Sequence, residues 1–318
     1  MRTLLRRLAV FLALVVAADQ AIGWALARMF WSPANTELDD ISPGIRYAPQ
    51  VVVSGSSRAK THYVADSLET YLGKRAFNFG RDGQRSSLYH YAVARMMLAH
   101  RAPELWLLEV DEAVFAGDED PGRLADLLPY ADRYPEVREV VEERSATEPL
   151  KLWSRIYPYN SMALTLVKSR IRPPGPVARN GYRSLQGELA APAGGAAPAG
   201  FASAAAEHAP AGQVNARKLE YLRRTLRELA GRGVRVVAVR SPVYPESAEA
   251  WRAHRREGER LRAMFASLGV RFVDMQAAGD SGFADPGLYK DARHLNERGA
   301  TRFTRALADS LLRAGPAR

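Results

Sequence analysis

The chain has 318 residues, of which 47% are hydrophobic, so it is long enough to bury a substantial core. It contains no cysteine, which excludes disulfides, thiolate nucleophiles and cysteine-ligated zinc sites. The formal net charge is +10. The arginines are scattered through predicted helices rather than gathered beside aromatic side chains, so we do not expect the chain to bind nucleic acid.

The N-terminus predicts a membrane anchor. Arginines stand at positions 2, 6 and 7, the apolar run Leu8–Ala18 follows, and the apolar character resumes after Asp19. A helix of residues 8–30 is long enough to span a bilayer, although a central carboxylate costs about 2.5–3.5 kcal/mol there. We predict that residues 1–31 form an uncleaved signal anchor of a single-pass inner-membrane protein whose remaining part is periplasmic or otherwise extracytoplasmic. A cleaved signal peptide and a buried helix of a soluble protein are the alternatives.

Residues 32–49 are predicted to be a linker, and strands alternate with helices after it. The predicted strands are short and rich in Val, Leu or Phe: residues 50–54, 76–79, 104–110, 234–240 and 270–274. Helical periodicity is found at residues 219–231 and 246–268, and again after Asn296. This alternation predicts an α/β fold over residues 50–318, a three-layer sandwich with a parallel sheet of about five strands.

Two segments interrupt the alternation. Residues from about 112 to 172 read as a helical insertion within the domain. Residues 185–213 are rich in Ala, Gly and Pro, and such a stretch buries too little apolar surface to offset its ordering entropy. We therefore expect a disordered surface loop there.

A serine follows the first strand of the domain. The apolar run Val51–Val53 leads into Gly55-Ser56-Ser57, a tight turn that would place a hydroxyl at the carboxyl edge of the sheet. A serine becomes nucleophilic when a neighbouring base accepts its proton. Taken alone, the turn is a weak signal, and an ordinary strand–helix connection or a phosphate-binding turn explains it better than catalysis does.

A carboxylate and an imidazole lie three residues apart near the other end of the chain. This spacing lets Asp291 turn back onto the ring of His294, leaving the second ring nitrogen for Ser57. Taken alone, the pair could be a helix-capping turn. His62 is a rival base, but five residues after Ser57 on the same helix its side chain is expected to point away from the hydroxyl.

The order Ser, Asp, His and the motifs around these residues resemble the SGNH/GDSL hydrolase superfamily. Gly55-Ser56-Ser57-Arg58 stands where that family has its Gly-Asp-Ser-Leu block. Asn78-Phe79-Gly80-Arg81-Asp82-Gly83 is similar to the second block, Asn-x-Gly-x-x-Gly. Asp291-Ala-Arg-His294, followed by Leu-Asn, is similar to the last block, Asp-x-x-His.

The resemblance implies a flavodoxin-like fold and a role for each matched residue. Ser57 would be the nucleophile, His294 the base and Asp291 its partner. The backbone N–H groups of Ser57 and Gly83 would form the oxyanion hole. Arg58 is a candidate substrate contact. The sequence has no His-Glu-x-x-His or similar metal-binding pattern, so we expect no metal ion, and we expect no cofactor.

The third block of the family is where the chain departs from the pattern. Many members supply an asparagine from Gly-x-Asn-Asp to the oxyanion hole, whereas this chain has Asp111-Glu112. A carboxylate repels an oxyanion, and losing one donor typically costs about 10²–10³ in rate. Either two backbone donors suffice, or the helical insertion adds one, or the activity is changed or lost.

Among SGNH proteins, the combination of an anchor with these motifs resembles membrane-anchored envelope acyltransferases and esterases. The resemblance implies a serine esterase or O-acyltransferase that acts on acyl esters of an envelope or extracellular polysaccharide or lipid. It also implies a membrane-bound O-acyltransferase as a candidate partner. The alternative is a non-catalytic SGNH-like scaffold that binds a glycan or partners the membrane acyltransferase.

Overall fold

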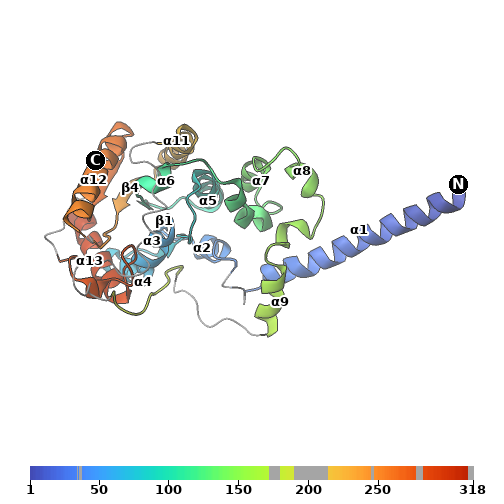
Figure 1. Ribbon diagram of the computed structural model, residues 1–318, viewed down its shortest axis with the longest axis horizontal. Helices are drawn as coiled ribbons and strands as arrows, with labels where there is room; N and C mark the ends of the chain where they lie inside the picture. The colour runs from blue at the N-terminus through green and yellow to red at the C-terminus, as the bar shows by residue number, and fades with distance from the viewer. Residues whose placement is uncertain are drawn as a thin grey trace. The chain divides into compact units, whose positions relative to one another are not determined.

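The computed structural model describes residues 1–33, 35, 38–171, 180–189, 214–244, 247–276 and 282–313 (Figure 1). The chain forms two compact units. One, the sheet unit, contains residues 41–119 and 178–318. The other, the N-terminal unit, contains residues 1–40 and 120–177.

The sheet unit is built on five parallel strands. They are β1 (Val51–Ser54), β2 (Ala76–Asn78), β3 (Leu105–Glu109), β4 (Arg235–Arg240) and β5 (Arg271–Asp274). Each lies within its predicted range. The strand order is β2-β1-β3-β4-β5, which is the doubly wound, flavodoxin-like order. The predicted fold class is confirmed.

The helices of the sheet unit follow the predicted alternation. They are α2 (Ser42–Tyr47), α3 (Ser57–His62), α4 (Ala65–Leu72), α5 (Ser87–His100), α6 (Glu112–Phe115), α11 (Ala216–Gly231), α12 (Ala248–Ser267), the 3-10 turn η5 (Pro286–Leu288) and α13 (Glu297–Arg313). Helix α2 falls inside the segment predicted as a linker. Asn296 accepts a hydrogen bond from the Gly299 N–H at 3.0 Å, as expected of the residue that caps α13.

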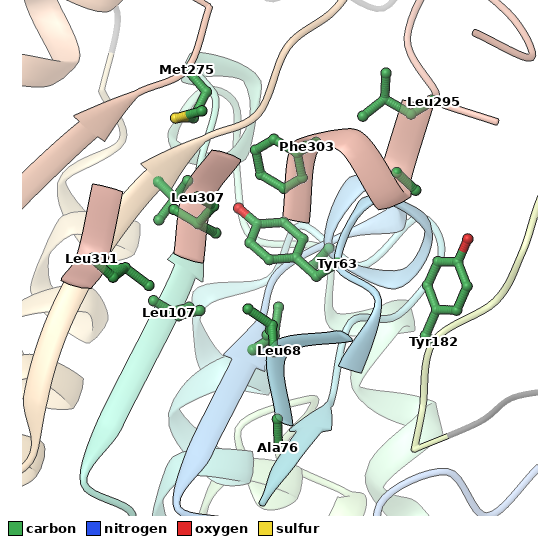
Figure 2. Packing of buried hydrophobic residues seen from close by; sticks show 14 of the residues in the cluster. Tyr63, Leu68, Ala76, Leu107, Tyr182, Met275, Leu295, Phe303, Leu307 and Leu311 are labelled. Carbon is green, nitrogen blue, oxygen red and sulfur yellow. The ribbon is translucent and has the colours of Figure 1, made fainter. Parts of the chain in front are cut away.

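Alternate residues of the strands supply two separate cores. Val51, Val53 and Leu107 face one side, where α3, α4 and α13 cover them. Figure 2 shows Phe303 of α13 beside Tyr63, with Leu307 and Leu311 farther along the helix. The two rings meet edge to face with centroids 4.9 Å apart. This core fixes α13 against β1 and β3, and therefore fixes the segment that precedes α13.

The opposite side of the sheet packs against α6, α11 and α12. Leu222, Leu261 and Phe265 form its core together with Ala238 of β4. Phe265 stacks on Phe272 of β5 with a centroid separation of 5.7 Å. Helices therefore cover both faces, and the sheet unit is a three-layer sandwich.

The N-terminal unit contains α1 (Arg2–Phe30), the 3-10 helix η1 (Pro121–Tyr130), α7 (Pro135–Glu142), α8 (Glu148–Lys151), the 3-10 turn η2 (Tyr157–Tyr159) and α9 (Ala163–Ile171). The second segment of this unit begins at residue 120, so α6 belongs to the sheet unit. Phe30 is fully buried in the unit and contacts Tyr130 edge to face at 5.5 Å.

The segment predicted as a disordered loop is described only at its beginning. Leu189 N–H donates to the Tyr289 carbonyl at 2.7 Å, and Glu297 N–H donates to the Leu185 carbonyl at 2.9 Å. Residues 185–189 therefore lie along the start of α13 instead of forming part of a free loop. Residues 190–213 lie outside the described residues.

The core on the α13 side makes a stability prediction. Phe303 is fully buried, so Phe303→Ala should lower the free energy of unfolding by about 3–5 kcal/mol through lost burial and the cavity left behind. Leu312 lies on the same helix but is 59% exposed, and Leu312→Ala should cost less than about 0.5 kcal/mol. Denaturant unfolding of the purified chain in detergent measures both, and equal losses would show that α13 does not pack as described.

Candidate active site

Ser57 lies at the carboxyl edge of the sheet, directly after β1. Gly55 adopts a φ of +146°, and a Cβ there would come within 2.9 Å of the Ala59 and Glu109 Cβ atoms. A side chain at this position would be strained and crowded, so glycine allows the turn. Ser57 then becomes the first residue of α3, with its side chain partly exposed.

The structure brings together the three residues predicted as a catalytic set. His294 Nε2 lies 2.9 Å from Ser57 Oγ. His294 Nδ1 lies 3.0 Å from each carboxylate oxygen of Asp291. A carboxylate accepts only, so the ring proton lies on Nδ1 and leaves Nε2 to accept the Ser57 hydroxyl proton.

Asp291 is held in the ionised form by its own turn. Its Oδ1 accepts the backbone N–H groups of Arg293 and His294 at 2.9 and 3.0 Å. Burial alone would raise the pKa of Asp291, but the His294 ring N–H and these backbone donors outweigh burial and lower the pKa. The carboxylate therefore stays charged and fixes the tautomer of His294.

His62 is placed away from Ser57 and is occupied on both ring nitrogens. Its Nε2 accepts the Leu295 N–H at 3.0 Å, so its proton lies on Nδ1, which donates to Ser241 Oγ at 2.8 Å. Burial, reinforced by the neighbouring His294 and Arg58, holds the pKa of His62 well below its ordinary value. His62 is therefore a neutral buried bridge that holds the backbone next to His294.

Beneath the Ser57 turn lies a buried charge cluster that the sequence analysis missed. Glu109, the last residue of β3, is 2.9 Å from Arg58 Nη2 and accepts a hydrogen bond from Ser241 Oγ at 2.8 Å. The Tyr63 hydroxyl also donates to Glu109. Burial alone would lower the pKa of Arg58, but Glu109 and Asp111 outweigh burial and raise the pKa. Burial raises the pKa of Glu109, and Arg58 and the hydrogen bonds from Tyr63 and Ser241 offset only part of that rise. Both side chains of the pair are buried and hydrogen-bonded.

Arg58 was predicted as a candidate substrate contact, and the structure places it elsewhere. Its side chain is only 6% exposed, and its Nη2 also donates to the Val110 carbonyl at 3.0 Å. The guanidinium thus faces the end of β3 rather than solvent. The guanidinium charge is paired with the Glu109 and Asp111 carboxylates inside the protein.

The second motif is pressed against the first. Asn78 donates to the Ala59 and Tyr63 carbonyls at 2.6 and 3.0 Å and accepts the Gly80 N–H at 2.8 Å. A Cβ at Gly80 would lie 2.3 Å from Lys60 N, so the loop runs directly over the backbone of α3. Gly83 lies farther along the loop at an exposed turn, with a φ of +66°.

Asp111 follows β3, where the family resemblance led us to look for an asparagine, and its carboxylate has structural partners. Its Oδ2 is 3.1 Å from Arg58 Nη2, and its Oδ1 accepts the Val114 N–H at 2.9 Å. The residue therefore caps the start of α6 and pairs with a buried cation. It supplies no hydrogen-bond donor to replace an asparagine amide.

The missed residues carried a signal in the sequence. Glu109 ends an apolar strand and Ser241 directly follows another, and polar residues at the carboxyl ends of neighbouring parallel strands meet at one edge. Neither matched a family motif, so neither was singled out. Among the residues that the structure describes, no group of three or more His, Asp or Glu side chains is placed to hold a metal ion.

Comparison with known proteins gives distant likenesses among solved structures alone. No family model and no curated protein matches the chain. Among solved structures, a protein from Bacteroides fragilis described as a candidate acylhydrolase is 12% identical, with a TM-score of 0.40. The match covers 88% of this chain and 99% of the other. A likeness this distant assigns no activity, so the function must be argued from the site itself.

The charge cluster makes a prediction with a control on the same strand. Glu109→Ala should cost about 3–5 kcal/mol in the free energy of unfolding, because it weakens the charge compensation of the buried Arg58. Glu104 precedes the same strand and pairs with Lys74, but both side chains are at least 41% exposed, so Glu104→Ala should cost about 1 kcal/mol or less. Denaturant unfolding measures both, and equal costs would mean that the buried pair contributes no more than a surface pair.

Proposed function

We propose that this protein is a membrane-anchored serine esterase or O-acyltransferase of the SGNH type, with Ser57 as nucleophile, His294 as base and Asp291 as its partner. The observation that carries the proposal is the hydrogen-bonded series from Ser57 through His294 to Asp291. Ser57 and His294 are 237 positions apart in the sequence, and Asp291 and His294 are 3 apart. They meet with Nε2 of His294 facing the hydroxyl and Nδ1 facing the carboxylate, as proton transfer requires.

The proposed reaction has two steps. In the first, Ser57 Oγ attacks the carbonyl carbon of an ester while His294 Nε2 takes the hydroxyl proton. His294 then gives this proton to the leaving alcohol oxygen, and the acyl group stays on Ser57. In the second step, His294 accepts a proton from water or a sugar hydroxyl, whose oxygen attacks the acyl carbon. The bond from that carbon to Ser57 Oγ then breaks, and His294 returns the proton to Ser57. Asp291 stabilises the imidazolium in both steps.

The oxyanion hole in this proposal uses the backbone N–H groups of Ser57 and Gly83. Asp111 cannot contribute because its carboxylate accepts hydrogen bonds and pairs with Arg58. With one donor fewer than in enzymes that have the asparagine, a slower reaction on simple esters is expected.

The proposed location and substrate rest on the N-terminal helix and on the family resemblance. Within the described residues, one helix, α1, is long enough and apolar enough to cross a membrane. Signal sequences share this property. Its first half exposes its apolar side chains, including Leu8, Phe11 and Leu14, which disfavours burial in a soluble core. We infer a cell-membrane anchor and, as substrate, an acyl ester of an envelope polysaccharide or lipid. A membrane-bound O-acyltransferase is the proposed partner.

A non-catalytic scaffold is the second candidate, favoured by the lack of an asparagine donor at Asp111. A fluorophosphonate probe distinguishes the two, because it reacts with an activated serine and not with an idle one. We expect the folded protein and Ser56→Ala to be labelled and Ser57→Ala not to be. Ser56 is the adjacent serine of the same turn, so it controls for the position of the label. A folded parent protein that takes no label would favour the scaffold.

Turnover of a small ester tests whether the three residues act together. Ser57→Ala and His294→Ala should each lower kcat by several orders of magnitude, and the double variant should be scarcely slower than either, because residues that serve one proton transfer are not additive. Asp291→Asn should cost less, since nucleophile and base remain. If the kcat of the double variant fell by the product of the two single-variant losses, this assignment would be overturned. The comparison requires that all variants melt within a few degrees of the parent.

Topology gives a separate prediction. The three arginines before the apolar span favour a cytoplasmic N-terminus. A reporter enzyme fused after Arg318 should be active only outside the cytoplasm. A fusion active in the cytoplasm would contradict the proposed orientation without bearing on the catalytic residues.

A further inference from the structure

Exposed apolar side chains gather in the N-terminal unit beyond the span itself. Outside α1 and the terminal Met1, the described chain has seven exposed large hydrophobic residues, and five of them are in the insertion: Leu150, Trp153, Leu164, Val167 and Ile171. We call these five the apolar collar. Trp153 and Ile171 are each 78% exposed. Single exposed apolar residues are ordinary, but a set of this size in one small unit indicates an interaction surface.

Helix α9 contributes three members of the collar from one face. Leu164, Val167 and Ile171 are spaced by three and four residues, which places them on one side of the helix. Leu166, on the opposite side, is fully buried. Helix α9 contacts α1, and Figure 1 shows it beside the C-terminal part of that helix. An exposed apolar face thus runs along a helix that is attached to the anchor.

Hydrogen bonds fix Trp153 beside the anchor at a definite height. The Asp19 carboxylate accepts Ser154 Oγ at 2.5 Å and the Arg155 N–H at 2.8 Å. A Cβ at Gly23, one turn later, would lie 2.3 Å from the Arg155 Cβ, so the two segments are in direct contact. The carboxylate that interrupts the apolar helix is therefore satisfied by the insertion, and the turn that carries Trp153 lies at the level of residue 19.

The length of α1 shows how deep Asp19 would lie if the helix crossed a bilayer. A hydrocarbon core of about 30 Å needs about 20 helical residues. A span that begins at Leu8 would end near Ala27. If the N-terminal arginines extend to the headgroups and the span begins at Thr3, it would end near Ile22, about 5 Å beyond Asp19. The span from Thr3 therefore places the turn next to Asp19 within about 5 Å of the membrane boundary, whereas the span from Leu8 would place it about 12 Å inside the hydrocarbon.

We propose that the apolar collar docks onto the lipid bilayer that α1 enters, so that the N-terminal unit is seated in the interface rather than held away from it by a single helix. Tryptophan favours this boundary, and an apolar helix face typically lies 5–10 Å into it. Lys168 and Arg170 are exposed on α9 and complement anionic headgroups. The occupant is lipid, and the inference does not depend on the catalytic proposal.

The cysteine-free sequence allows a direct test in the full chain. Trp153→Cys, Leu164→Cys and Ile171→Cys would each carry an environment-sensitive fluorophore, with the protein reconstituted alone into phosphatidylethanolamine–phosphatidylglycerol vesicles. Phe11→Cys reports the span, and Leu312→Cys reports an exposed apolar position of the sheet unit. The labels at 153, 164 and 171 should show blue-shifted emission, quenching by lipid-borne nitroxides and protection from aqueous iodide. The label at 312 should be quenched by iodide.

Each outcome separates the docking from the other proposals. If iodide quenches the collar labels while lipid nitroxides quench position 11, the anchor stands and the docking is overturned. If iodide quenches the label at position 11 as well, both the membrane anchor and the docking are overturned. Protection of the collar from both quenchers would mean that protein, such as a second copy of the chain, covers it, which overturns lipid as the occupant. Lipid quenching at 312 equal to that at 153 would overturn the collar as a specific surface. Fluorophosphonate labelling of Ser57 is a separate measurement and changes with none of these.

Discussion

The buried contact between Arg58 and Glu109 is the interaction on which the site depends. Arg58 is the neighbour of Ser57, and Glu109 ends the central strand of the sheet, so the contact ties the nucleophile turn to the most rigid part of the fold. A guanidinium with less than a tenth of its side chain exposed is tolerated only because carboxylates and a backbone carbonyl surround it. The same carboxylate accepts hydrogen bonds from Tyr63 and Ser241, and through Ser241 the network reaches His62.

This network supports the catalytic set from both sides. Glu109 holds Arg58, the residue after Ser57, and His62 accepts the N–H of Leu295, the residue after His294. The distance between nucleophile and base therefore does not rest on the 2.9 Å hydrogen bond between them alone. It follows from the sheet, from α3 and from the packing of α13, whose Phe303 meets Tyr63 in the core below. The candidate site keeps its geometry because Ser57 and His294 are each held by a buried, hydrogen-bonded neighbour.

The two units divide the physical tasks of the chain. The sheet unit presents polar side chains at the carboxyl edge of its strands, where doubly wound folds bind their ligands. The N-terminal unit presents apolar side chains on α1 and in the apolar collar, and it satisfies the one carboxylate of the apolar helix with donors from the insertion. An ester on an envelope glycan or lipid would suit a chain with both properties.

The sequence by itself determined the strands, the order of the helices and the three residues of the candidate catalytic set. Those features are local, because apolar strand runs, helical periodicity and the Asp-x-x-His spacing depend on neighbours in the chain. The tertiary structure alone decided what Arg58, His62 and Asp111 do. A guanidinium after the nucleophile reads as a substrate contact until Glu109, 51 positions later, is seen to engage it. Likewise Asp19 reads as a flaw in an apolar helix until the Ser154 turn is seen to bind it. The role of a charged side chain depends on the groups that surround it, and these groups come close only when distant segments pack together.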